Sequence, residues 1–255
     1  MTKTAMHSVD INCDLGEGRT RADCQRDARL MPFISRCNIA CGGHAGSATT
    51  MALSLENAAL HNLAIGAHPS YPDREHFGRA SMSLETDQLL QSLCEQVHSL
   101  KHIADARTLA LDHVKLHGAL YNDAEADDAL AEKIVGLFAR EFPELRILGL
   151  ANGAMERAAR KIGQPVIREG FMDRRYLSAH QLAPRNMPGA VINSFDACLQ
   201  QVISLCAGTP FPSIHGDPLQ ITADSICLHG DNTDAEKIAR DLAAALSRAG
   251  YEIKR

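Results

Sequence analysis

Two kinds of segment alternate along this sequence, and that alternation limits the possible folds more than any other feature. Short apolar runs typical of strands are followed by longer segments with apolar residues at helical spacing, about seven times over. The expected strands are residues 9–15, 37–44, 63–68, 113–117, 146–152, 165–169 and 225–229. The expected helices are residues 48–61, 85–106, 126–140, 155–162, 195–206 and 234–249. This order predicts a parallel sheet, either open and doubly wound or closed into a barrel.

The polarity of the strand faces distinguishes these two architectures. Alternate residues of a strand share a face, so Asp10, Asn12 and Asp14 lie together, as do Lys115 and His117. An open sheet covered by helices on both sides would need apolar residues on both faces. We therefore expect an α/β fold of the TIM-barrel type, a seven-stranded (β/α) barrel with a partly polar interior. Residues 1–255 should form this single domain, with a small hairpin inserted at 210–222.

Composition excludes several classes of protein. With 45% hydrophobic and 22% charged residues, the chain is too apolar to be disordered. A net charge of -5 without any basic block argues against nucleic acid as a main partner. The sequence has no long apolar stretch, and residues 1–8 do not resemble a secretory signal, so we expect a cytoplasmic protein without a membrane partner. The eight cysteines are expected to be reduced, and a homo-oligomer is compatible with the sequence.

Polar residues gather where the expected strands end. They are Asp14, His44, His68, His117, Asn152, Glu169 and His229. In a parallel barrel these ends meet at one mouth. A single histidine in such a place is commonly structural, but so many together indicate a functional site.

Asp14, Glu17 and Lys115 could carry acid–base chemistry. Crowded carboxylates at residues 14 and 17 would raise one pKa, as a general acid or base requires, although either residue could instead cap the next helix. A buried Lys115 needs an acidic partner, for which Asp14 and Asp10 are the candidates. Such a pair can be purely structural, or the lysine can donate to a developing oxyanion or a phosphate.

A second group of residues suits an anionic substrate. The loop after the strand at 165–169 is rich in charge, and its arginines could bind a carboxylate or phosphate in bidentate fashion. The candidates are Arg79, Arg168, Arg174 and Arg185, each of which could also be an ordinary surface charge. His98 and His102 have a spacing that can hold zinc, but without the glutamate of a metalloprotease motif we favour a simple helix surface.

Six motifs carry a resemblance to a known family. They are DINCDLGEG at 10–18, NIACGGHAG at 38–46, IGAHPSYPD at 65–73, FGR at 77–79, VKLHGALYN at 114–122 and CLHGD at 227–231. In this order they resemble the LamB/YcsF family. The resemblance implies a seven-stranded barrel related to the glycoside hydrolase/deacetylase group. It also implies the A subunit of a bacterial 5-oxoprolinase, which opens 5-oxo-L-proline (pyroglutamate) to L-glutamate with ATP and its usual Mg counterion. Two further subunits, of B and C type, are then the expected partners.

The resemblance also selects site residues: Asp14, His44, His68, Lys115, His117, Glu169, Asp173, Arg174 and His229. We expect Asp14 or Glu169 to act as the general base on water, and Lys115 and His117 to stabilise charge developing on oxygen. The expected substrate-binding residues are Asn12, His44, His68, Arg79, Asp173, Arg174 and His229.

Two other functions remain open at this point. One is a metal-dependent deacetylase of an N-acetylated sugar, since a strand-end aspartate with two histidines can bind a divalent ion. The other is a non-catalytic subunit that only binds the substrate. Whether the protein itself holds a metal is left open.

Overall fold

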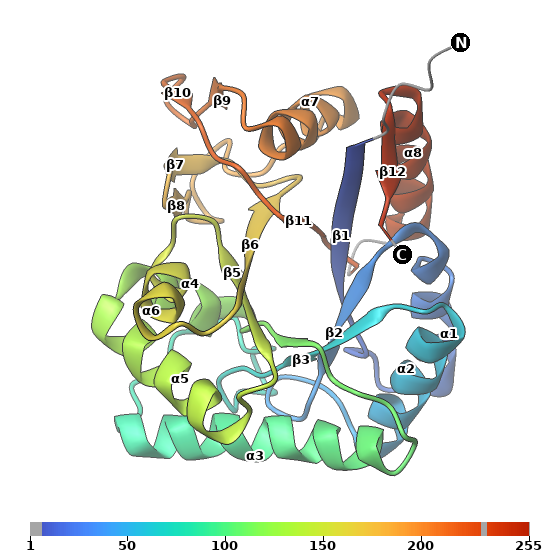
Figure 1. Cartoon of the computed structure of the whole chain (residues 1–255), viewed down its shortest axis with the longest axis vertical. Coiled ribbons are helices and arrows are strands. Elements are labelled where there is room, and N and C mark those ends of the chain that lie inside the picture. The colour runs from blue at the N-terminus through green and yellow to red at the C-terminus, as the bar shows by residue number, and fades with distance from the viewer. Residues whose placement is uncertain (1–6, 231–233, 255) are drawn as a thin grey trace.

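Seven parallel strands close into a barrel in the computed structural model, which describes residues 7–230 and 234–254 (Figure 1). They are β1 (His7–Leu15), β2 (Arg36–Ala40), β3 (Ala64–His68), β4 (His113–Val114), β5 (Arg146–Leu150), β6 (Val166–Phe171) and β11 (Ser225–Leu228). Neighbours follow chain order from β1 to β6, and β11 pairs with both β6 and β1 to complete the ring. The predicted seven-stranded barrel is confirmed. Residues 1–6, most of the stretch considered as a targeting signal, and Asp231, the last residue of the 227–231 motif, lie outside the described residues.

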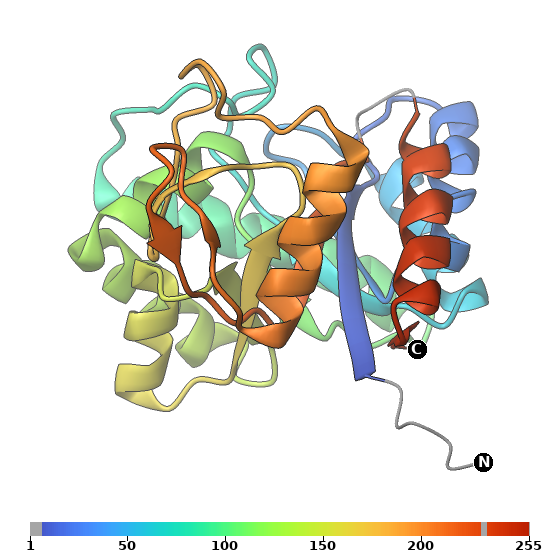
Figure 2. The same ribbon diagram turned by 90° about the horizontal axis from the view of Figure 1, so that it is seen from above.

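Helices surround the barrel and bury one apolar face each. They are α1 (Arg21–Ala28), α2 (Ala48–Leu60), α3 (Thr86–Asp105), α4 (Gly118–Ala126), α5 (Asp128–Glu141), α6 (Ala154–Ile162), α7 (Phe195–Ala207) and α8 (Ala235–Arg248), with a short 3-10 helix at Met31–Phe33. In α3, Leu89, Leu93, Val97 and Leu100 recur at helical spacing and are buried. Figure 2 shows α7 and α8 side by side on the outside of the barrel. Within the described residues, no helix has both the length and the apolarity needed to span a membrane.

Several elements differ from the sequence-based expectation. The second strand was expected to reach residue 44 but ends at Ala40, because the chain turns at Gly42, whose φ is 112°. Helices α1 and α4 were not expected, nor was β12 (Tyr251–Ile253), which extends the sheet beside β1. A two-stranded sheet of β7 (Tyr176–Ser178) and β8 (Gln181–Leu182) was also missed.

A small hairpin does lie within residues 210–222. Its strands are β9 (Phe211–Pro212) and β10 (Pro218–Leu219), which pair in antiparallel fashion. Each of these strands is two residues long.

The barrel interior is polar at the end where the strands begin. Arg36 lies there with its side chain 4% exposed, and its Nη2 is 2.6 Å from Asp10 Oδ2. The same guanidinium donates from Nη1 to Asp112 Oδ2 at 2.8 Å, and Ser225 donates to Asp10. Asp10 is therefore the partner of Arg36 and not of Lys115, which was one of the two alternatives. A buried charge pair of this kind holds the strands together only while both members are present.

Replacing Arg36 with methionine should lower the free energy of unfolding by about 3–5 kcal/mol, because Asp10 would remain as a buried, uncompensated charge. Denaturant unfolding followed by circular dichroism measures this. Arg146→Met is the matched control, because Arg146 pairs with Asp112 at the partly exposed edge of the same cluster. This replacement should lower the free energy of unfolding by about 1 kcal/mol or less. Equal effects of the two substitutions would contradict this account of the interior.

Candidate active site

Lys115 is the centre of a buried charge network at the carboxyl end of the barrel. Its Nζ lies 2.8 Å from Glu169 Oε1, 3.0 Å from Asp14 Oδ1 and 3.1 Å from Asn12 Oδ1. These residues come from β6 and β1, and Lys115 itself directly follows β4. The period of two along each strand aims them at the barrel axis, as predicted for Asn12, Asp14 and Lys115.

The charge states of this network follow from its contacts. Burial opposes the charge on Lys115, but Asp14, Cys227 and Glu169 outweigh it and hold the pKa of the amine well above its usual range. Burial likewise opposes ionisation of Asp14, yet His68 and Lys115 hold the pKa of this carboxyl well below its usual range. Asn38 adds a hydrogen bond of 2.8 Å to Asp14 Oδ1. Lys115 is therefore a fixed cation and Asp14 a fixed anion at neutral pH.

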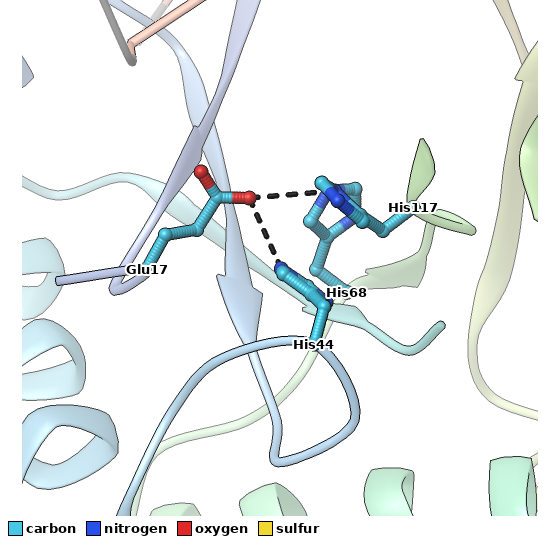
Figure 3. Close-up of side chains that lie close together, drawn as sticks. All are labelled: Glu17, His44, His68 and His117. Atoms are coloured by element: carbon cyan, nitrogen blue, oxygen red, sulfur yellow. Dashed lines mark hydrogen bonds and ion pairs between the residues drawn. The ribbon is translucent and has the colours of Figure 1, made fainter. Parts of the chain in front are cut away.

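Three histidines and a glutamate converge beside this network (Figure 3). Glu17 Oε1 lies 3.1 Å from His44 Nε2 and 3.3 Å from His117 Nδ1, and His117 Nδ1 lies 3.0 Å from His68 Nε2. The rings of His44 and His117 are stacked with centroids 3.6 Å apart. Each of the four residues offers one possible metal-ligand atom, and these four atoms lie within 4.8 Å of one another, a grouping that could hold a metal ion.

Burial sets the protonation of these rings. It lowers the pKa of His44 to about 2 and that of His117 to about 3, and in both cases the nearby His68 adds to the effect. Gly78 allows the close packing, because a Cβ at this position would lie 2.9 Å from His44 Cβ and 3.1 Å from His117 Cδ2. Its φ of +62° is also one that glycine adopts readily. Both imidazoles are thus neutral at physiological pH.

A pocket of about 670 Å³ opens onto the network. Of the predicted site residues, those that line it are Asp14, His68, Arg79, Lys115, His117, Arg174 and His229. Four others do not line it: Asn12 and Glu169 are fully buried, His44 borders a second, smaller pocket, and Asp173 contacts His229. Asn152 lies exposed after β5 and does not border the large pocket.

Arginines line the pocket as well. Arg79, Arg174 and Arg185 all border it. Arg174 is 6% exposed, its Nη2 donates to Ala183 O at 2.7 Å, and its Nε has no hydrogen-bond partner among the described residues. Burial and the neighbouring Arg185 lower the pKa of Arg174. A buried guanidinium with a spare donor favours an anionic ligand.

Asp173 and His229 form a separate pair at the pocket edge. His229 Nδ1 lies 2.9 Å from the Asp173 carboxylate. Burial opposes ionisation of Asp173, but the hydrogen bond from His229 outweighs it and lowers the pKa of the carboxyl. Asp173 therefore orients the imidazole of His229. Arg168, another candidate from the sequence, points elsewhere and pairs with Asp224 at 2.6 Å, outside the pocket.

Two carboxyl groups of the pocket, those of Asp123 and Glu125, were not expected from the sequence, and the role of a third, that of Glu17, was undecided. Glu125 of α4 lines the pocket, and burial raises its pKa to about 8, so it is a neutral acid at pH 7. A side chain at Gly149 or Gly153 would overlap it, so these two glycines make room for the buried carboxyl. Glu17 was left between a catalytic role and a helix cap; the cap of α1 is Thr20, and Glu17 joins the histidines.

Fold and site together define the class: a (β/α)-barrel protein with a lysine–carboxylate network and clustered histidines at the carboxyl ends of its strands. The model of the LamB/YcsF family matches residues 9–255. The chain belongs to the LamB/YcsF family, as its motifs indicated.

Relatives cover almost the whole chain. A protein from Heliobacterium modesticaldum that is named as the A subunit of 5-oxoprolinase is 40% identical over 96% of this chain and 97% of its own length. The protein of the same name from Erwinia tasmaniensis is 41% identical over 96% of this chain and 98% of its own. Among solved structures, the lactam utilization protein from Thermus thermophilus matches with a TM-score of 0.87 and 33% identity, over 97% of this chain and 99% of that one.

A more distant solved structure shares the fold alone. The putative cellobiose-phosphate cleavage protein from Enterococcus faecalis V583 has a TM-score of 0.61 at 12% identity, and the match covers 98% of this chain and 97% of that one. The barrel architecture is therefore shared with a protein of very low sequence identity.

Proposed function

We propose that this chain is one subunit of an ATP-dependent 5-oxoprolinase and that its pocket opens the lactam ring of 5-oxo-L-proline to give L-glutamate. The observation that carries the proposal is Lys115, a cation held by the buried carboxylate of Glu169 and the partly buried one of Asp14, at the wall of a pocket that also contains buried arginine. Relatives at about 40% identity that are named as the A subunit of 5-oxoprolinase support the choice of substrate.

The chemistry of ring opening fits the charges in the pocket. Hydrolysis breaks the lactam C–N bond, adds the oxygen of water to the carbonyl carbon and leaves a proton on the released amine. A resonance-stabilised amide resists this attack, so the negative charge that develops on its oxygen needs strong stabilisation. Lys115 is the proposed partner of that oxygen, and Asp14 orients the attacking water. His117 was also expected to stabilise this charge, but its Nε2 donates to the Phe77 carbonyl at 3.0 Å, so the proposal gives it no contact with the oxygen. Glu125, neutral at pH 7, is the proposed proton donor to the nitrogen.

The remaining predicted residues have supporting roles in this proposal. Glu169 is fully buried, so we assign it to positioning Lys115 and not to contact with water. Arg174, with Arg79, binds the substrate carboxylate, and His229 borders the same space. ATP, with Mg²⁺, supplies the driving force, and its terminal phosphoryl group ends as inorganic phosphate. Two further subunits, of B and C type, complete the proposed enzyme.

The test is glutamate formation by the reconstituted complex. The purified chain is mixed with candidate B-type and C-type subunits, 5-oxo-L-proline, ATP and Mg²⁺, and glutamate and phosphate are measured over time. We expect equal amounts of both products, which appear only when all subunits are present. N-acetylglucosamine serves as the alternative substrate. Release of acetate from it, without glutamate from 5-oxoproline, would overturn the proposal in favour of a deacetylase.

A further inference from the structure

We propose that Glu17, His44, His68 and His117 bind one divalent transition-metal ion, for which Zn²⁺ has the most suitable chemistry. The four residues come from separate parts of the chain, each near the carboxyl end of a barrel strand, and point toward one another (Figure 3). The three histidines are buried. Their ligand atoms lie within 4.8 Å of one another, and each ring is held in place by a partner on its far side.

Two of the rings are each fixed by a backbone carbonyl. His68 Nδ1 lies 2.9 Å from the carbonyl oxygen of Lys115, and His117 Nε2 lies 3.0 Å from that of Phe77. A carbonyl can only accept, so these two ring nitrogens carry the protons. In a neutral imidazole the opposite nitrogen then presents a lone pair. Those opposite nitrogens, His68 Nε2 and His117 Nδ1, face each other at 3.0 Å.

The third ring repeats this arrangement against a carboxylate. Ser70 Oγ donates its single hydrogen to the carbonyl of Tyr71 at 2.8 Å, so it accepts from His44 Nδ1 at 3.0 Å. His44 Nε2 therefore presents its lone pair to Glu17 Oε1, 3.1 Å away. With all three rings neutral, as metal-bound imidazoles are, the cluster contains two close contacts between acceptor atoms. A proton on His68 Nε2, which also lies 3.3 Å from Asp14 Oδ2, would relieve one of them, whereas one doubly charged cation relieves both at once.

The distances fit a metal ion. Ligands at 2.0–2.1 Å around tetrahedral zinc are separated from one another by roughly 3.3 Å. Three of the six separations here are 3.0 Å, 3.1 Å and 3.3 Å, close to that value before any adjustment to an ion, and all four ligand atoms lie within 4.8 Å of one another. Imidazole nitrogens with one carboxylate oxygen are typical ligands of zinc and its neighbours. The carbonyls and the Ser70 hydroxyl are the outer partners that metal-binding histidines usually have.

The site lies beside the lysine network. Asp14 Oδ2 is 3.3 Å from His68 Nε2, and Asp14, Glu17 and His117 all border the 670 Å³ pocket. An ion here would be within reach of a ligand in that pocket. Any part it takes in opening the lactam rests on the function proposed above, whereas its binding does not.

The metal content of the untagged chain tests the proposal. Protein dialysed against metal-free buffer is analysed by mass spectrometry for transition metals, and the chelator-stripped chain is titrated with Zn²⁺ and with Co²⁺, whose absorption spectrum reports coordination. We expect about one ion per chain and, for Co²⁺, the absorption spectrum typical of a four-coordinate ion. Loss of an outer partner alone changes metal affinity about 10–100-fold, so Glu17→Gln and His117→Asn should weaken binding at least that much.

A second cluster supplies the control. Cys94, His98 and Glu141 also lie close together, but none of the three is buried, and His98 packs against Phe142. His98→Ala should leave the metal content and the cobalt spectrum unchanged. A stripped wild-type chain that binds neither ion at micromolar concentration would overturn the proposal. Loss of metal binding in His98→Ala, with binding retained in His117→Asn, would overturn it as well. Glutamate formation by a complex whose chain has been stripped of the ion would refute only a part for the ion in the reaction. A chain that binds the ion in a reconstituted complex that forms no glutamate would refute only the proposed function.

Discussion

Replacing Lys115 with methionine should reduce the rate of glutamate formation about 10²–10³-fold in the reconstituted enzyme. Lys115 is the cation of the pocket that two carboxylates hold in place, at 2.8 Å and 3.0 Å. Methionine has a similar length but cannot stabilise negative charge on the substrate oxygen. The loss expected is that of one preorganised donor to an oxyanion. The measurement is kcat for glutamate release at saturating 5-oxoproline and ATP.

This variant needs a control for folding, since removal of the lysine leaves Glu169 and Asp14 with less compensation. The double variant Lys115→Met with Glu169→Gln removes one charge of each sign. It should recover most of the stability lost by Lys115→Met in denaturant unfolding, and its turnover should stay low. Turnover that returned together with stability would show that Lys115 is structural, which is the alternative that its burial suggests.

Replacing Arg174 with methionine should raise the KM for 5-oxoproline roughly 30-fold or more. Arg174 is buried at the pocket wall with an Nε donor that has no partner among the described residues. Truncating one member of a buried, hydrogen-bonded charge pair typically costs about 2–5 kcal/mol of binding free energy. Because about 1.4 kcal/mol corresponds to a tenfold change in affinity, the lower end of this range gives roughly 30-fold. A residue that only binds the carboxylate lowers affinity without changing kcat.

Arg168→Met is the matched control for Arg174. Arg168 lies six residues earlier in the chain, pairs with Asp224 and lies outside the pocket, so its replacement should leave KM unchanged. An unchanged KM for Arg174→Met, or an equal rise for both variants, would show that the arginine region does not bind the substrate.

Much of the architecture was predictable because strand geometry is local. The alternation of Asp10, Asn12 and Asp14 with apolar neighbours placed these side chains inside the barrel, where the structure has them. The same period predicted that Lys115 would point inward with Asp14 within reach, and the distance is 3.0 Å. The helix beginning at residue 118 was missed, and with it the burial of Glu125, because its apolar residues show a weaker pattern than those of α3.

By itself, the sequence determined the barrel, the rim where its polar residues gather and the family to which the chain belongs. Those depend on periodicity and on motifs, both of which are properties of neighbours along the chain. Only the tertiary structure decided that Asp10 pairs with Arg36 and that Glu17 meets three histidines. It also decided which ring nitrogens face one another. These outcomes depend on contacts between residues far apart in the chain. A shift of one ångström between two side chains, or one proton on a ring, alters such contacts without any change in the periodicity of the sequence.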